Sequence, residues 1–464
     1  MKTQARVVVI GGGVVGVSTL YHLAKKGWSD VVLVERKELT SGSTWHAAGL
    51  LPLFNMSYTV GQLHKYSVDL YKRLQAETGQ DVSFHATGNL RLATSRDRMD
   101  EYRKYCGTAN TIGVPFEIIG PQQVKELWPL LTLGGTDDTA AIVGGLYHPQ
   151  DGHIAPADLT MALRKGARAK GAEICEQTEV TAVARTRAGE WKLTTNKGEI
   201  TCEHVVCATG NYARQTGKMF GLNVPAIPVE HQYIVTEPIA GVPKDLPTLR
   251  DPDRLTYYKE EVGGLVMGGY EPNPIPWDVA APPEGFEFQL LDEDWDHFEP
   301  IMQLALGRVP ALSTAGIKRM INGPESFTPD GNFIVGEAPG LRNYFVCAGF
   351  NSAGIANSGG AGQLIAQWIE GGEAPSDLWD VDVRRFGPFT ANRRALRERT
   401  VETLGLHYAM RWPRQELETA RRLRTSPLYD VLAARGAEFG AKNGWERANY
   451  FRRDGEKRPE FSLG

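Results

Sequence analysis

The chain has 464 residues, of which 42% are hydrophobic and 23% charged, and its formal net charge is -4. One hydrophobic core rarely serves more than about 300 residues, so we expect at least two domains. The weak negative charge excludes the positive field that nucleic-acid binding needs. No apolar run approaches about 18 residues, so we expect no insertion into a membrane.

The five cysteines are too few and too scattered for a disulfide framework, and no CxxC pair predicts a zinc or other metal site. An apolar run begins within six residues of Met1, which leaves no room for a secretory signal. A reducing compartment is therefore favoured, and we expect the protein in the cytoplasm.

The first 35 residues predict a dinucleotide-binding unit. The run RVVVI is followed at once by GGGVVG, and apolar residues then recur at helical spacing. Gly11 would permit the tight turn, Gly13 would let the backbone approach a pyrophosphate, and Gly16 would let the helix pack on the sheet. A second strand, VVLV, ends in Glu35, which can accept hydrogen bonds from ribose hydroxyls. FAD or NAD is thus favoured over NADP.

The next stretch, SGSTWHAAGL at residues 41–50, places a Trp-His pair among small residues. Small residues would let this loop lie along an extended cofactor, whereas an NAD-binding unit usually continues with regular strand and helix repeats. FAD is therefore favoured. The imidazole of His46 could anchor the cofactor covalently or make an ordinary hydrogen bond, and the residues alone leave both roles open.

Later elements predict a return to the same site and a second sheet. Strands at 204–208 and 344–348 end at glycines, and the glycines from Gly354 onward would let a second helix begin close to the cofactor or simply pack on the sheet. Residues 84–94, 230–236 and 255–269 alternate, as in an antiparallel sheet with one covered face.

Two further segments predict helices. Residues 284–299 are acidic, which is typical of a solvated helix face, and Trp295, Phe298 and Met302 would lie on the buried face. After Phe386 arginines alternate with acids, and we interpret this segment as a helical extension over the surface rather than a nucleic-acid arm.

Motifs along nearly the whole chain carry a family resemblance. They are VVVIGGGVVG, SGSTWHAAGL, FHATGNLRLATS, DGHIAPADLTMAL, HVVCATGNYAR, PVEHQYIVTE, NGPESFTPDGNFIVGEAPG and NGWERANYF. Together they resemble the flavin domain of the dimethylglycine dehydrogenase and sarcosine dehydrogenase family, within the glycine- and D-amino-acid-oxidase group.

The resemblance implies an α/β fold of the D-amino-acid-oxidase type. A Rossmann-like FAD-binding domain would comprise residues 1–83, 141–226 and 321–385. An α+β substrate domain built on an antiparallel sheet would be interleaved with it, at residues 84–140 and 227–320. A C-terminal helical extension would occupy residues 386–464.

The resemblance also implies a set of cofactor-binding residues, with FAD attached covalently through His46. They are Gly11, Gly13, Gly16, Glu35, Arg36, Ser43, Thr44, His46, Ala48, Leu50, Val180, Gly210, Gly349, Gly354 and Ile355.

Oxidation of an N-methyl amine moves a hydride to the flavin and needs a neutral amine, so we expect a proton-accepting group beside the substrate. His231 suits proton transfer near neutral pH, although it could be an ordinary core residue. Strand alternation lets only one of Tyr257 and Tyr258 face the cofactor. The resemblance favours Tyr258 as catalytic and leaves Tyr257 for substrate binding, although either could simply pack. Arg91 and Arg250, in matching family segments, are candidates for holding a substrate carboxylate.

The function implied is FAD-dependent oxidative N-demethylation of a small N-methylated amino acid, with dimethylglycine ahead of sarcosine. The alternative is a flavin subunit that serves mainly partner docking and electron relay. Oxygen or an electron-transfer flavoprotein would accept the electrons. Family members continue into a folate-binding domain, whereas this sequence stops at residues 461–464 (FSLG), so tetrahydrofolate is a partner only if a missing domain exists.

Overall fold

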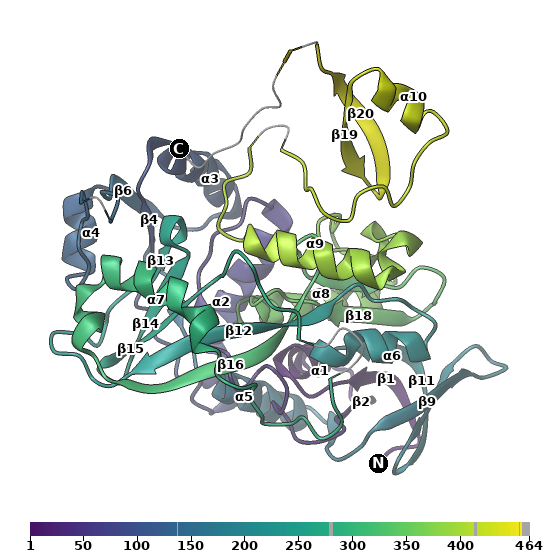
Figure 1. The fold of residues 1–464 in the computed structure, drawn as a ribbon. Coiled ribbons are helices and arrows are strands. Elements are labelled where there is room, and N and C mark those ends of the chain that lie inside the picture. The colour runs from purple at the N-terminus through teal and green to yellow at the C-terminus, as the bar shows by residue number, and fades with distance from the viewer. Residues whose placement is uncertain (137, 278–281, 413–414, 454, 457–464) are drawn as a thin grey trace.

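A computed structural model describes residues 1–136, 138–277, 282–412, 415–453 and 455–456 (Figure 1). Two eight-stranded sheets lie side by side in this part of the chain, and a small hairpin projects from them at the C-terminal end. The mixed α/β architecture agrees with the expected fold class. No helix among the described residues is long and apolar enough to cross a membrane.

The first sheet is formed by the N-terminal strand and its parallel neighbours. Its order is β17 (Ile334–Glu337), β18 (Tyr344–Ala348), β11 (Gly198–Cys207), β1 (Gln4–Ile10), β2 (Val31–Val34) and β8 (Glu173–Cys175), with β10 (Trp191–Thr195) and β9 (Val180–Arg185) extending from β11. Val7, Val8 and Val9 of β1 are fully buried. Both faces of this strand are covered, which explains why the sequence there is continuously apolar.

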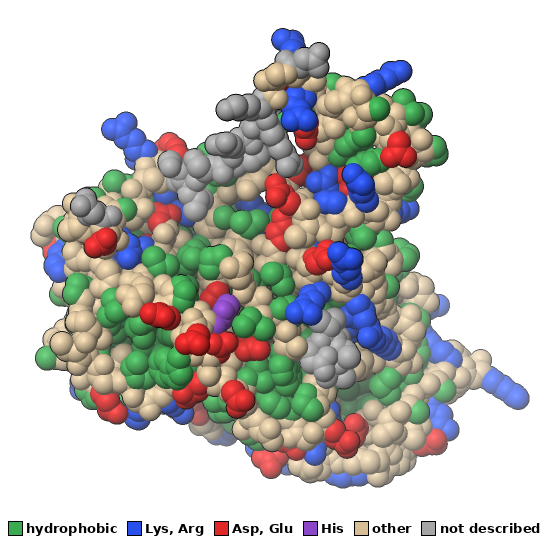
Figure 2. Space-filling view, viewed as in Figure 1, with side chains coloured by type: hydrophobic (Ala, Val, Ile, Leu, Met, Phe, Trp, Pro, Cys, Tyr) green, Lys and Arg blue, Asp and Glu red, His purple; other side chains and the backbone are tan. Residues whose placement is uncertain are grey.

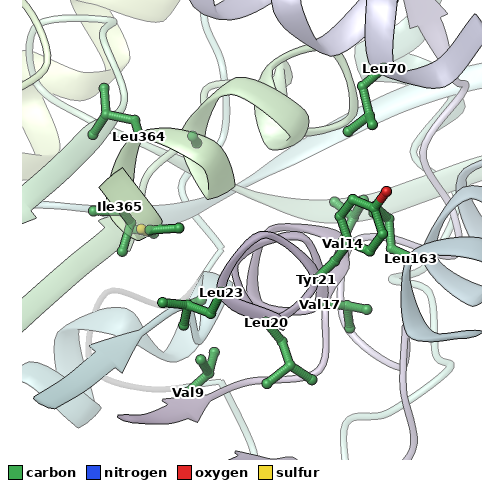
Figure 3. Close-up of a cluster of buried hydrophobic side chains, with 14 of the residues drawn as sticks. Val9, Val14, Val17, Leu20, Tyr21, Leu23, Leu70, Leu163, Leu364 and Ile365 are labelled. Atoms are coloured by element: carbon green, nitrogen blue, oxygen red, sulfur yellow. The ribbon is translucent and has the colours of Figure 1, made fainter. Parts of the chain in front are cut away.

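Four helices form a tightly packed layer against this sheet. They are α1 (Val14–Lys25), α2 (Tyr58–Thr78), α5 (Pro156–Ala169) and α8 (Gly354–Gly371). Figure 3 shows Leu20 and Leu23 of α1 near Val9 of β1, with Leu364 and Ile365 of α8 above them. Glycines allow α8 to approach so closely, because a β-carbon at Gly362 would lie 2.7 Å from the carbonyl carbon of Ser18.

The second sheet is mainly antiparallel. Its order is β16 (Ile317–Phe327), β12 (Ile227–Thr236), β15 (Gly264–Gly269), β14 (Thr256–Glu261), β13 (Thr248–Asp251), β4 (Asn89–Ala93), β6 (Gly144–His148) and β5 (Glu117–Ile119). One face packs on α7 (Trp295–Arg308), burying Ile234, Met267 and Phe298 in one apolar cluster. The opposite face carries polar and aromatic side chains.

The remaining elements cover the edges. Near β4 and β6 lie α3 (Arg96–Ile112) and α4 (Pro121–Leu127), and α6 (Ala213–Met219) lies near β11. β3 (Leu50–Leu51) and β7 (Gly152–His153) form a short antiparallel pair. The C-terminal segment holds α9 (Arg393–Gly405), α10 (Tyr429–Ala434) and the hairpin of β19 (Ala437–Lys442) and β20 (Trp445–Phe451).

Two expectations need correction. Strand β6 pairs with β4 and β5, although we placed its residues in the FAD-binding domain. The C-terminal segment is not helical throughout, because residues 437–451 form a hairpin. Residues 461–464 lie outside the described residues.

The acidic helix begins later than its composition suggested, at Trp295, because the carboxylate of Asp294 accepts a hydrogen bond from the amide of His297 and caps it. Trp295 is exposed rather than buried, whereas Phe298 is fully buried. Figure 2 shows acidic side chains gathered over this region, and Asp296 and Glu299 are exposed there.

Because α8 lies so close to α1, an added methyl group at their contact should destabilise the protein. Gly362→Ala should lower the free energy of unfolding by about 1–3 kcal/mol, because the added methyl overlaps α1 backbone. The matched change Gly371→Ala, in the last turn of the same helix and with open space around it, should stabilise by up to about 1 kcal/mol. Denaturant unfolding measures both, and equal effects would contradict the packing argument.

Candidate functional site

A cleft of about 320 Å³ opens where β1, β2 and β11 end. Open α/β sheets bind ligands in such a position, outside the carboxyl ends of the strands. Many of the expected cofactor residues line it: Gly11, Gly13, Glu35, Arg36, Ser43, Thr44, Val180, Gly210, Gly349, Gly354 and Ile355. Gly16, His46, Ala48 and Leu50 do not.

The turn after β1 has the shape of a phosphate cradle. Gly11 has a φ of 111°, and a β-carbon there would overlap the carbonyl of Ala208 at the end of β11. A β-carbon at Gly16 would overlap the carbonyl of Gly11, so α1 begins directly against the strand end. Gly13 has no side chain to cap this helix, and the amide of Val14 donates to the hydroxyl of Thr44 at 3.2 Å. Gly13, Val14 and Val15 all line the cleft, so the helix N-terminus lies at the cleft.

Glu35 closes the adjoining side of the cleft. The amides of Gly12 and Lys37 donate to its two carboxylate oxygens at 2.6 and 2.8 Å, which fixes the side chain. Burial raises the pKa of this carboxyl, although those two amides oppose the shift. Beside it, the guanidinium of Arg36 lies 3.7 Å from the ring centre of Tyr212 and forms a flat wall of the same cleft.

His46 lies in a smaller pocket next to the main cleft, lined also by Ser43, Asn211 and Phe286. The hydroxyl of Tyr233 donates to the carbonyl of His46 at 2.7 Å, and Gly323 makes room for the ring. Burial lowers the pKa of this imidazole to about 4, so it is neutral at physiological pH. A neutral, held imidazole keeps a lone pair available for bonding. Ala48 and Leu50 instead pack with Tyr233, Tyr257 and Tyr270 on the face of the second sheet opposite α7.

His231 and Tyr257 lie next to each other on the face of the second sheet opposite α7. The Nε2 atom of His231 lies 2.9 Å from the hydroxyl of Tyr257. Gly268, between the strands that carry them, permits this, because a β-carbon there would overlap the Tyr257 hydroxyl. Burial and the nearby Arg250 lower the pKa of His231 to about 3. The imidazole is therefore neutral and a weak proton acceptor.

Tyr258 points the other way. It is fully buried in the apolar cluster beneath α7, with its ring 5.6 Å from that of Trp128. Alternation along β14 puts consecutive side chains on opposite faces, as expected, but the tyrosine on the site face is Tyr257. Our choice of Tyr258 as the catalytic tyrosine is not supported by this placement.

The two candidate arginines lie side by side. Arg250 of β13 pairs with Arg91 of β4 in register, and both are about 92% buried. Arg250 donates to the hydroxyl of Tyr408 at 2.8 Å and lies near the face of Tyr257, while Arg91 lies 4.1 Å from the ring centre of Phe54. Among the described residues neither forms an ion pair with an acid. Two buried cations without a carboxylate suit an anionic ligand.

The C-terminal segment completes this cluster, a contribution that the sequence did not suggest. The backbone carbonyl of Tyr408 accepts from Arg98, which is itself held by Asp253. The ring of His407 stacks on Tyr270 with 3.9 Å between centres. This part of the extension therefore lies over the site and does more than cover the surface.

One acid of the cleft was also missed. Glu325 of β16 lines the cleft, and strand register places it on the same face as His231, since Gly323 pairs with His231 and alternate residues share a face. It belongs to the stretch NGPESFTPDG. That stretch carried the resemblance, but only the long-range pairing of β12 with β16 shows which of its residues face the site.

Comparison with known proteins agrees with this arrangement. The profile of the family described as "FAD dependent oxidoreductase" matches residues 6–368, and that of its central domain matches residues 371–426. The crystal structure of L-proline dehydrogenase from P. horikoshii superposes with a TM-score of 0.73 at 26% identity, covering 83% of this chain and 98% of that one.

Three curated relatives are similar over nearly the whole chain. The 4-methylaminobutanoate oxidase of Paenarthrobacter nicotinovorans is 41% identical over 97% of this chain and 54% of its own length. The rat mitochondrial dimethylglycine dehydrogenase is 39% identical, covering 99% and 54%. The mouse mitochondrial pyruvate dehydrogenase phosphatase regulatory subunit is 39% identical, covering 97% and 51%.

The resemblance to dimethylglycine and sarcosine dehydrogenases is thereby confirmed, and the chain spans about half the length of the curated relatives it matches. The glycine cradle, the helix N-terminus at the cleft and the partly buried acid that follows β2 are the features that a dinucleotide cofactor requires. With its profile match over most of the chain, the protein belongs to the family of FAD-dependent oxidoreductases.

Proposed function

We propose that the protein catalyses the oxidative N-demethylation of a small N-methylated amino acid, with dimethylglycine as the first substrate to test and sarcosine as the alternative. The main support is a pair of buried guanidinium groups, those of Arg91 and Arg250, which have no acidic partner among the described residues. They adjoin the His231–Tyr257 pair and offer a charge complementary to an amino acid carboxylate.

Bound FAD would supply the hydride acceptor for oxidation of the methyl carbon, and water would hydrolyse the resulting substrate iminium to formaldehyde and the demethylated amine. The glycine turn and the N-terminus of α1 would hold its pyrophosphate, and Glu35 its ribose. Arg250 and Arg91 would orient the substrate through its carboxylate. Tyr257 and His231, fixed by their hydrogen bond, would position the methylamine end.

We also infer that FAD is attached covalently through His46. The support is the neutral, buried ring, its anchored backbone and the glycine that makes room for it. The electron acceptor is proposed to be oxygen or an electron-transfer flavoprotein, with tetrahydrofolate a partner only through a further domain. Five free cysteines support a reducing compartment, for which we propose the cytoplasm, although the relatives named as dimethylglycine dehydrogenase, sarcosine dehydrogenase and regulatory subunit are named as mitochondrial.

A second role has one observation in its favour. The mouse relative named as a regulatory subunit is as similar to this chain as the named dehydrogenase. In a regulatory role this chain would bind FAD and serve mainly to dock a partner and relay electrons. Substrate reduction of the flavin distinguishes the two roles.

Anaerobic mixing of the purified flavoprotein with small amines tests the function. Dimethylglycine and sarcosine should bleach the flavin absorbance. Dimethylamine, which has no carboxylate, should react about 10–100-fold more slowly at equal concentration, because the arginine contacts of about 1.5–3 kcal/mol are lost. Trimethylglycine, which has no free lone pair on nitrogen, should leave the flavin oxidised. Persistent yellow colour with every N-methylated amino acid would exclude the dehydrogenase.

The two adjacent tyrosines provide a matched pair of variants. Tyr257→Phe should slow flavin reduction about tenfold or more, because it removes the hydroxyl that holds His231. Tyr258→Phe should change that rate less than twofold, because its ring lies in the apolar cluster on the other face. Stopped-flow absorbance gives both rates, and a larger effect at Tyr258 would reverse the assignment.

Covalent attachment can be read without any substrate. Acid precipitation of the wild-type protein should leave a yellow pellet, and His46→Ala should release all flavin into the supernatant while keeping the fold. His64→Ala, at another buried histidine outside the cleft, is the control and should stay yellow. Free flavin from the wild type would overturn the covalent bond but not the binding of FAD.

A further inference from the structure

A carboxyl group in the cleft has no role in the account above. Three acids line the cleft, Glu35, Glu179 and Glu325. The amide of Thr178 donates to the carbonyl of Glu35, so Glu179, the next residue, lies with Glu35 at the dinucleotide end. Glu325 lies apart from them, on the strand that pairs with the His231 strand.

Among the described residues, Glu325 forms no ion pair, and Ser352 lines the same cleft. Its Oε2 atom is shielded from solvent and accepts no hydrogen bond from any described residue. Tyr257 and Tyr270 lie close enough for the negative charge of Glu325 to raise their pKa values. An oxygen without a donor in such a place suits a donor from a ligand.

Charges of opposite sign stand at the two ends of this cluster. The guanidinium of Arg250 lies 6.0 Å from the ring centre of Tyr270. Glu325 and Ser352 line the cleft. The cluster therefore holds a cation at Arg250 and a carboxyl at Glu325, the two charges that would attract the carboxylate and the ammonium of a zwitterionic amino acid.

We propose that Glu325 is the catalytic residue that receives the substrate ammonium, accepting a hydrogen bond from its N–H and then taking up that proton before oxidation. The inference rests on the proposed demethylation. In this step an N–H bond breaks, an O–H bond forms on Glu325 and the electron pair stays on nitrogen. Nothing is oxidised or reduced, and the neutral amine is then a hydride donor toward FAD.

His231 is less suited to this step than we expected. Its Nε2 atom is engaged with Tyr257, and the neighbouring Arg250 and His46 oppose a positive charge on the ring. Burial raises the pKa of Glu325 to about 7, so this carboxylate can gain a proton near neutral pH. His231 is then a positioning residue that holds Tyr257.

Other groups around Glu325 keep their charge state over the relevant range. Tyr233 of β12, Tyr257 of β14 and Tyr270 after β15 face it, and burial raises the pKa of all three well above neutrality. Arg250 stays charged, and His46 stays neutral because its pKa is lowered to about 4. A change of rate between pH 6 and 9 therefore reports on Glu325 and on the amine.

The test is the pH dependence of anaerobic flavin reduction, measured as the second-order rate constant at low sarcosine or dimethylglycine. The rate constant of the wild type should rise about tenfold per pH unit up to near pH 7 and then stay constant. Glu325→Gln can use only amine that is already neutral, so its rate should keep rising toward the amine's own pKa of about 10. At pH 8 the rate constant of this variant should still be rising about tenfold per pH unit, whereas that of the wild type has levelled.

Glu271→Gln is the matched control. Glu271 is a buried acid whose pKa is also raised to about 7, but it does not line the cleft, so its removal should leave the break near pH 7 in place. Glu325→Asp keeps a carboxylate, so its pH profile of flavin reduction should still level off, at a shifted pH. This variant tests the role of Glu325 if Glu325→Gln fails to bind flavin.

The outcomes separate the two proposals. A break near pH 7 that survives in Glu325→Gln, or that disappears in Glu271→Gln, overturns the role of Glu325 and leaves demethylation standing. A wild type that no N-methylated amino acid reduces at any pH overturns both.

Discussion

The pairing of β12 with β16 is the constraint on which the site depends. It sets His231 opposite Gly323 and Val229 opposite Glu325, and it runs from Ile227 to Thr236 along one strand. Side chains alternate between faces, so a slip of one residue would turn the site side chains into the apolar cluster beneath α7. The apolar residues between them must stay buried, which fixes the register of the two strands. The register in turn fixes the positions of the site residues.

Space on the site face is made by glycines opposite large rings. Gly268 lies under Tyr257, and Gly323 lies against His46, so each ring reaches across a neighbouring strand. Arg250 is surrounded by aromatic faces and hydroxyls instead of an acid. Cation–π contacts and hydrogen bonds to neutral groups stabilise the buried guanidinium without neutralising it. Its positive charge can therefore still attract an anionic ligand.

The sequence could predict the elements that depend on local spacing. The glycine turn, the first helix and Glu35 follow one another within 35 residues, and the structure has them in that order. Alternation correctly allowed only one tyrosine on the site face, but choosing between Tyr257 and Tyr258 requires the neighbours of β14. Glu325 and Tyr408 were missed because strand register and C-terminal packing bring together residues more than 90 positions apart, and no local pattern records that distance.

The position of Tyr408 has a consequence for how the enzyme is made. The residues of the cofactor cleft end at Ile355, whereas the hydroxyl that meets Arg250 comes from a residue 53 positions later. Synthesis runs from the N-terminus to the C-terminus, so the residues of the cofactor cleft leave the ribosome before Tyr408. A nascent chain can thus complete that cleft before the residue that meets Arg250 and Arg98 exists.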